Sequence, residues 1–108
     1  MELLNEGVAT QVALESEGWT LVRTDEGFNY VDSEGNFLSE ENFIFADSFI
    51  GGKATVKRMN GLWNYIKTDG TMLCSEDFVA VAVFVGPVGY VYKEGKWFTI
   101  DKAGNLLV

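Results

Sequence analysis

The sequence predicts an all-β fold in which antiparallel hairpin repeats of about 35 residues stack into a small β-sheet or solenoid-like domain. Three similar segments support this prediction: FNYVDSEGNFL from Phe28, WNYIKTDGTML from Trp63 and WFTIDKAGNLL from Trp97. Their first residues stand 35 and then 34 positions apart. Each segment is rich in aromatic and β-branched residues and ends in a glycine turn, which is typical of strands and not of helices.

The similarity extends beyond these segments, because SEENF, ending at Phe43, corresponds to SEDF, ending at Phe78. Farther along, Phe49 corresponds to Phe84. The segment WTLVRTDEG from Trp19 resembles the same unit, but it also reads as a hairpin that leads into the Phe28 segment. We therefore divide a single domain, residues 1–108, into a partial repeat 1–27, repeats 28–62 and 63–96, and a partial repeat 97–108.

Local patterns predict the strands within each repeat. KATVKR should pair with LWNYIK as a hairpin, followed by a short extended segment at TML and a buried strand at FVAVAVF, residues 78–84. The N-terminal VATQVAL also favours a strand, which brings the expected total to about nine strands in antiparallel pairs. Pro87 is the only proline and should occupy a bulge or a strand start, because it cannot donate a ladder hydrogen bond.

Tight turns separate these strands. DSEG, KTDG and DKAG place glycine fourth in the turn, where a positive φ costs it little, and Asp32 and Asp101 stand first, where a carboxylate can accept backbone N–H bonds. RMNG, KEG and DEG predict hairpin turns for the same reason. We interpret the recurring aromatic residues as an inward core layer and the recurring glycines as turn formers. These structural anchors are Trp19, Phe28, Trp63, Trp97, Gly35, Gly70 and Gly104.

The repeat resembles the bacterial WG repeat, also called KWG, in FIGGKATVKRMNGLWNYIKTDG and again in FVGPVGYVYKEGKWFTIDKAG. The resemblance covers nearly the whole chain and is weaker over the first 25 residues. The glycine that names the family is Asn64 after Trp63 and Phe98 after Trp97, and its tryptophan is Phe28 in the first unit, so the chain resembles a divergent member. The resemblance implies a stacked β-repeat fold with an interaction role.

Composition argues against several chemistries. The chain has no histidine, which removes the usual general base and the commonest transition-metal ligand. With Cys74 as the only cysteine, it can form neither an intramolecular disulfide nor a structural zinc site, and we expect this residue to pack in the core of a cytoplasmic protein. The start of the sequence does not resemble a signal peptide, and its longest apolar run is interrupted by glycine and proline. We predict no catalytic residues, no cofactor, no metal and no membrane contact.

Two carboxylate chemistries compete with a structural interpretation. Glu34, Glu40, Glu41 and Glu76 include candidates for a two-acid glycosidase pair, but most acids lie in repeated turns, where a structural role suffices. Asp32, Glu34 and Asn36 alternate as calcium ligands do, yet the glutamate required at position 12 of an EF-hand loop is missing. A turn is therefore the preferred interpretation of DSEGN.

Charge is distributed unevenly along the chain. The net charge is −8, made up of −10 over residues 1–47 and +2 over residues 48–108. A basic face for nucleic acid or an anionic membrane is therefore not expected, whereas a basic protein partner is compatible with this pattern. We predict six carboxylates as partner-binding residues: Glu34, Glu40, Glu41, Asp47, Glu76 and Asp77.

The leading functional hypothesis is a non-enzymatic protein–protein interaction module built from WG-like β-repeats. The alternative is a small acidic inhibitor, of the kind encoded by mobile elements, that occupies a basic nucleic-acid or effector groove by charge mimicry. Self-association is a third hypothesis, in which the acidic first half of one copy meets the basic second half of another.

Overall fold

The computed structural model describes residues 9–107, with side chains described from Val12 onward. This part of the chain is all β, with no helix, as the sequence predicted. Its ten strands exceed the expected nine. They are β1 Ala9–Ser16, β2 Trp19–Thr24, β3 Gly27–Val31, β4 Phe45–Ala46, β5 Lys53–Lys57, β6 Trp63–Lys67, β7 Ala80–Val85, β8 Val88–Lys93, β9 Lys96–Ile100 and β10 Leu106–Leu107.

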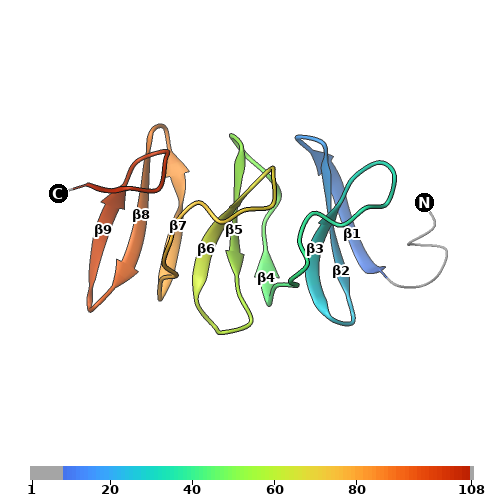
Figure 1. The fold of residues 1–108 in the computed structure, drawn as a ribbon, viewed down its shortest axis with the longest axis horizontal. Coiled ribbons are helices and arrows are strands. Elements are labelled where there is room, and N and C mark those ends of the chain that lie inside the picture. The colour runs from blue at the N-terminus through green and yellow to red at the C-terminus, as the bar shows by residue number, and fades with distance from the viewer. Residues whose placement is uncertain (1–8, 108) are drawn as a thin grey trace.

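The strands form three antiparallel sheets that follow one another along the long axis of the molecule (Figure 1). The first sheet has the order β1-β2-β3, the second β4-β5-β6 and the third β10-β9-β8-β7. The molecule measures 48 × 25 × 18 Å. The predicted hairpin between KATVKR and LWNYIK is confirmed by the pairing of β5 with β6. The predicted repeat boundaries at Phe28, Trp63 and Trp97 fall inside the sheets, because each of these residues belongs to a strand that pairs with the strand before it.

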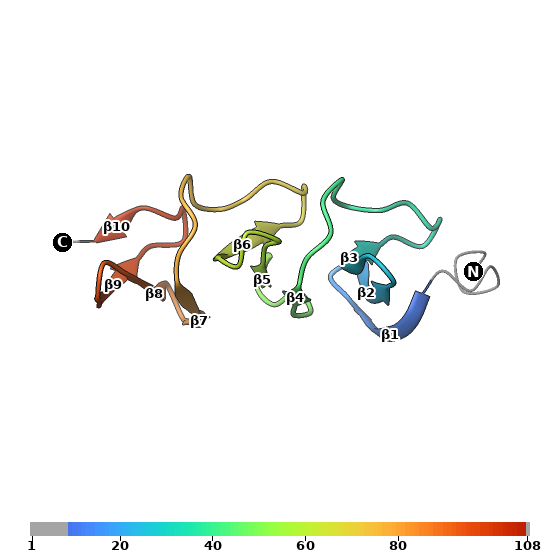
Figure 2. The same cartoon turned by 90° about the horizontal axis from the view of Figure 1, so that it is seen from below.

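The segments that join the sheets arch over one side of the strands (Figure 2). After β3 the chain pairs back onto that strand twice, through bridges from Val31 to Phe37 and from Phe28 to Phe43. After β6 it does the same, with Ile66 bridged to Met72 and Trp63 to Phe78. Phe43 and Phe78 are buried. These returning segments thus pair along the free edges of β3 and β6 and place Phe43 and Phe78 in the core.

The core consists of two clusters of buried side chains. The first includes Tyr30, Phe49, Val56 and Ile66 from the first two sheets. The second is made of Tyr65, Cys74, Phe78, Val91 and Ile100. Neighbouring sheets are joined by an aromatic pair at each boundary: Tyr30 with Phe49, at a centroid distance of 4.9 Å, and Tyr65 with Phe84, at 5.1 Å. Each such pair adds about 0.5–1.5 kcal/mol beyond the area it buries.

The predicted glycine turns are confirmed. Gly35, Gly70 and Gly104 have φ values of 87°, 87° and 86°, and each donates its N–H to the carbonyl three residues earlier. Gly70 and Gly104 also meet a second requirement, because an added Cβ would lie 2.8 Å from the Leu38 carbonyl oxygen and 2.5 Å from that of Leu73. A side chain at either position would therefore collide with the neighbouring connection as well as strain the backbone.

The first positions of two of these turns also behave as predicted. Asp32 Oδ1 accepts the backbone N–H groups of Glu34 and Asn36, both at 2.9 Å, and Asp101 does the same two and four residues ahead. These hydrogen bonds lower the pKa of both carboxyl groups, because they stabilise the ionised form. The carboxylate of DSEGN is thus used to shape the turn, which favours the turn interpretation of this segment.

Three expectations need correction. Trp97 is 53% exposed and is not a core anchor, because its ring contacts Tyr92 on the surface of the third sheet and lies outside both buried clusters; Trp19, Phe28 and Trp63 are half-buried. The strand predicted as buried at 78–84 forms β7 but leaves Val83 59% exposed, because β7 is an edge strand. Pro87 lies in the two-residue turn between β7 and β8, after Gly86 at a φ of 61°, and not in a bulge or strand.

Candidate interaction surface

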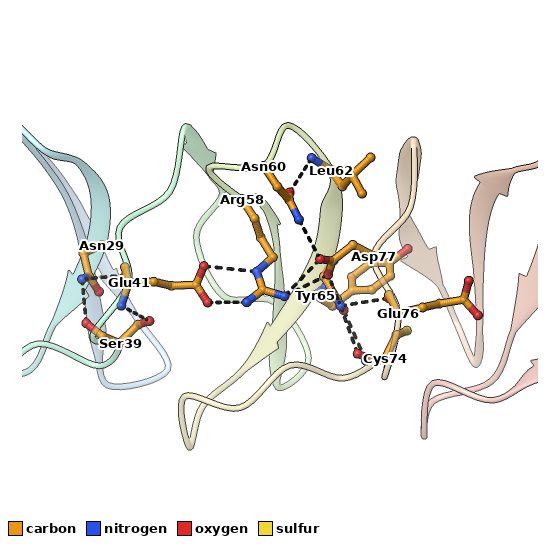
Figure 3. Close-up of polar contacts among 11 residues, drawn as sticks. Asn29, Ser39, Glu41, Arg58, Asn60, Leu62, Tyr65, Cys74, Glu76 and Asp77 are labelled. Carbon is orange, nitrogen blue, oxygen red and sulfur yellow. Dashed lines mark hydrogen bonds and ion pairs between the residues drawn. The ribbon is translucent and has the colours of Figure 1, made fainter.

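Arg58 engages two of the carboxylates predicted to bind a partner (Figure 3). Its Nε and Nη2 donate to the two carboxylate oxygens of Glu41, at 3.1 and 2.8 Å, and its Nη1 donates to both oxygens of Asp77, at 3.1 Å each. Glu41 belongs to the connection after the first sheet and Asp77 to the connection after the second. The hydrogen bonds to Glu41 raise the pKa of Arg58, against desolvation that lowers it, and the bonds to Asp77 add to the increase. Arg58 thus ties consecutive connections together.

Asn64 forms hydrogen bonds with the connection after the second sheet. Its Nδ2 donates to the carbonyls of Cys74 and Glu76 and to Asp77 Oδ1, at 3.0, 3.1 and 2.9 Å, while its Oδ1 accepts the N–H groups of Tyr65 and Cys74. Asn64 is only 1% exposed, and three of its hydrogen bonds, to the Cys74 carbonyl and from the N–H groups of Tyr65 and Cys74, are buried, while those to Glu76 and Asp77 are partly buried. Burial alone would make a bare amide unfavourable, and this network removes that penalty.

Asn29 makes the corresponding contacts in the first connection. Its Nδ2 donates to the carbonyls of Ser39 and Glu41 and to Asn42 Oδ1, and its Oδ1 accepts the N–H of Tyr30. At the corresponding position of the third sheet stands Phe98, which cannot form such bonds. The sequence did not indicate these two asparagines as important, because alternating polarity suggests that a strand amide faces solvent.

Asp77 sits at the meeting point of these networks. Desolvation raises its pKa, but hydrogen bonds from Asn64, Asn60 and Arg58, together with the charge of Arg58, outweigh that effect and leave the pKa below its usual value. Glu76, the neighbouring acid, pairs with Lys93 at 3.0 Å. Both acids are therefore occupied by intramolecular partners.

The remaining three predicted carboxylates differ in their surroundings. Asp47 accepts the Thr55 hydroxyl at 2.6 Å, and its backbone carbonyl accepts the Tyr30 hydroxyl. Glu34 and Glu40 are exposed. Of the six acids, four thus make side-chain contacts within the chain, and the structure does not gather the six into one patch.

A different surface brings partly exposed aromatic groups together. The ring centroids of Phe28 and Phe45 are 5.9 Å apart, and those of Phe45 and Trp63 are 5.8 Å apart, so these three rings run from the first sheet to the second. Arg23 lies over Phe28 and Lys57 over Trp63, at 5.5 and 6.0 Å from the ring centres. We call these five residues the aromatic row.

Strand register explains the aromatic row. Arg23 is paired with Phe28, Phe45 with Lys57 and Lys57 with Trp63, so the side chains of each pair point to the same face of their sheet. Phe45 lies in the two-residue strand β4 and is 41% exposed. In the third sheet the corresponding pair, Tyr92 and Trp97, makes an edge-to-face contact with its ring centroids 5.1 Å apart. Sequence reasoning singled out Phe28, Trp63 and Trp97, but as inward core anchors, and it missed Phe45 and both cations.

The predicted packing role of Cys74 is confirmed. It is buried, and desolvation, followed by the charges of Glu76, Asp101 and Asp77, raises the pKa of its thiol to about 11. Within residues 9–107, no group of three or more cysteine or acidic side chains is placed to hold a metal ion, and no helix there is long and apolar enough to span a membrane.

Comparison with known proteins gives no family assignment: no family model matches the chain, and none of the curated proteins matches it significantly.

Proposed function

We propose that this chain is a non-enzymatic protein–protein interaction module built from WG-like β-repeats, and that the aromatic row is its docking surface. The observation that carries the proposal is the continuous set of solvent-accessible rings from Phe28 through Phe45 to Trp63, flanked by Arg23 and Lys57. Aromatic and arginine side chains gathered on a surface are characteristic of binding hot spots, because each ring offers a large apolar area with little conformational entropy to lose.

Recurring contacts support the repeat character that we propose. The Asn29 and Asn64 networks use the same atoms, and the hydroxyls of Tyr30 and Tyr65 each donate to a carbonyl of the following sheet, at Asp47 and Ala82 respectively. Each tyrosine hydroxyl thus links its sheet to the next. An array joined in this way would hold the aromatic row rigid and would lower the entropic cost of binding.

The proposal is tested by affinity capture from the source cell with three forms of the protein. Phe45→Ser should remove the centre of the aromatic row without opening the core, because Phe45 is already 41% exposed. Leu14→Ser is the matched control, since Leu14 is 91% exposed and lies outside the row. We expect proteins captured by the wild type and by Leu14→Ser to be lost with Phe45→Ser. Equal capture by both variants, or capture of nothing above background by the wild type, would refute the proposed function.

A further inference from the structure

A groove of about 710 Å³ lies between the second and third sheets. Its floor includes the aromatic pair at this boundary, Tyr65 and Phe84, and its rim includes Ile50, which is 76% exposed. The side chains that decide its chemistry are Asp47, Lys53, Thr55, Phe84 and Lys102. The hydroxyl of Tyr65 is already used, because it donates to the Ala82 carbonyl of the third sheet.

The equivalent position between the first and second sheets is filled by the chain itself. Hairpin turns fix the equivalence: Ser16 pairs with Trp19 across one two-residue turn, and Ile50 pairs with Lys53 across the next. Trp19 therefore corresponds to Lys53, and Leu21, two residues on, corresponds to Thr55. Trp19 and Leu21 pack against the cluster that contains Tyr30 and Phe49. At the second boundary Lys53 and Thr55 stand where Trp19 and Leu21 stand at the first.

The first boundary also carries an acidic contact that the second lacks. The carboxylate of Glu17 accepts the backbone N–H groups of Gly51 and Gly52, at 2.7 and 2.8 Å. Glu17 holds a positive φ of 54°, so a non-glycine residue is kept in a strained turn conformation where its side chain makes this contact. At the second boundary Gly51 takes the place of Glu17, and Gly86 and Pro87 take the places of the two glycines. In residues 9–107, no carboxylate accepts the N–H of Gly86.

The charge of the groove complements an anion. Three charged side chains line it, Asp47, Lys53 and Lys102, and the single carboxylate, that of Asp47, already accepts the Thr55 hydroxyl. Lys53 places its ammonium 4.3 Å from the centre of the Phe84 ring, and Lys102 is exposed on the rim. Two ammonium groups thus flank an apolar floor in a chain of net charge −8.

We propose that this groove binds a segment of a protein partner in which an acidic residue is followed two positions later by a large aromatic residue. This inference rests on the proposed interaction function and names a second contact beside the aromatic row. The aromatic side chain would displace the Lys53 ammonium from the Phe84 ring and pack there, as Trp19 fills the first boundary. The carboxylate would meet Lys53, Lys102 and the Gly86 N–H, as Glu17 meets the turn of Gly51 and Gly52.

The probe is the peptide that already fills the first boundary, residues 16–21, Ser-Glu-Gly-Trp-Thr-Leu, with blocked ends. It is added to the ¹⁵N-labelled full chain to about 5 mM, because a short flexible peptide is expected to bind in the millimolar range. We expect saturable amide shifts at Gly86, Thr55 and Phe84. Control peptides with glutamine for glutamate, or alanine for tryptophan, should cause shifts at least fivefold smaller at equal concentration.

The matched variant is Lys53→Trp, which places an indole at the second boundary where Trp19 stands at the first and keeps the hydrogen bond from Thr55 to Asp47. It should raise the melting temperature and abolish the peptide shifts, whereas Lys96→Trp, an exposed lysine outside the groove, should do neither. No saturable shift, equal shifts with the control peptides, or shifts centred on Phe45 would overturn the groove assignment. Loss of partner capture with Phe45→Ser but not with Lys53→Trp would overturn this inference and leave the proposed function intact.

Discussion

Replacing Asn64 by alanine should be among the most destabilising single changes in the described part of the chain. The side chain makes five hydrogen-bond contacts of 2.7 to 3.2 Å: the two hydrogens of Nδ2 are shared among three acceptors, and Oδ1 accepts two N–H groups. Alanine leaves the N–H of Cys74 and the carbonyls of Cys74 and Glu76 without these partners. Each hydrogen bond contributes about 1 kcal/mol net. Water that enters the exposed side of the connection will replace some of them, so we expect a loss of about 3–4 kcal/mol.

The assay is urea unfolding at pH 7, followed by tryptophan fluorescence and far-ultraviolet circular dichroism. A loss of this size is a large fraction of the roughly 5–15 kcal/mol that stabilises a typical domain, so the unfolding midpoint should fall by more than 1 M at an m value of about 2 kcal/mol per M. Asn105→Ala is the control, because Asn105 is exposed and its amide makes one long contact, 3.4 Å, to Asp101. This control should cost less than about 0.5 kcal/mol.

A loss below about 1.5 kcal/mol in Asn64→Ala would refute the reasoning, because it would mean that water replaces the network at little cost. Asn29→Ala provides an independent check on the same argument. Asn29 lacks the bond that corresponds to the contact from the Cys74 N–H, and one of its donor contacts is longer, 3.3 Å. Its replacement should therefore cost slightly less than that of Asn64.

Four further predictions follow, the first two from the same networks. Arg58→Met should lower stability by about 1–2 kcal/mol, since it removes two partly exposed bidentate ion pairs while keeping much of the packing, and 1 M NaCl should shrink the difference from the wild type in urea unfolding. Asp77 has a pKa in the folded state below its unfolded value, so its ionised carboxylate stabilises the fold above about pH 4, and this stabilisation is lost as pH falls through the folded-state pKa. The free energy of unfolding, measured from pH 7 to 2, should therefore fall less steeply in Asp77→Asn. Cys74, whose thiol pKa is about 11, should resist labelling by a disulfide reagent at pH 8 in the native protein and react fully in urea, and rapid native labelling would contradict its burial. Finally, replacing Glu34 and Glu40 together by glutamine should leave partner capture unchanged if the aromatic row is the docking surface, whereas a several-fold loss would favour charge mimicry.

The hairpins and turns were predictable because their signals are local. A glycine such as Gly70 marks its turn through backbone conformation alone, and the alternation of KATVKR and LWNYIK fixes a strand pair within a few residues. The all-β class followed from these short-range patterns. The same patterns identified the strand at 80–85 but not its exposure, since burial depends on what lies beside an edge strand and not on the strand's own residues.

The candidate surface was less predictable for the same physical reason. Glu41 and Asp77 read as free acids, because nothing local shows that the Arg58 turn lies between their two connections. Phe45 stands in a segment too short to show a period, so only its register with Lys57 places it between Phe28 and Trp63. Contacts between residues far apart in the sequence determine which acids form ion pairs within the chain and which rings lie side by side.

The arrangement of sheets in a row has a consequence for how the molecule comes apart. The contacts that the structure describes between sheets join the first to the second and the second to the third, for example where β3 lies against β4 and β6 against β7. The first and third sheets should then unfold before the middle sheet, which has a neighbour on both sides. Hydrogen exchange should show this as slow amides on β5 and β6, with progressively faster exchange toward both termini, and a uniform rate across all three sheets would indicate a single cooperative unit.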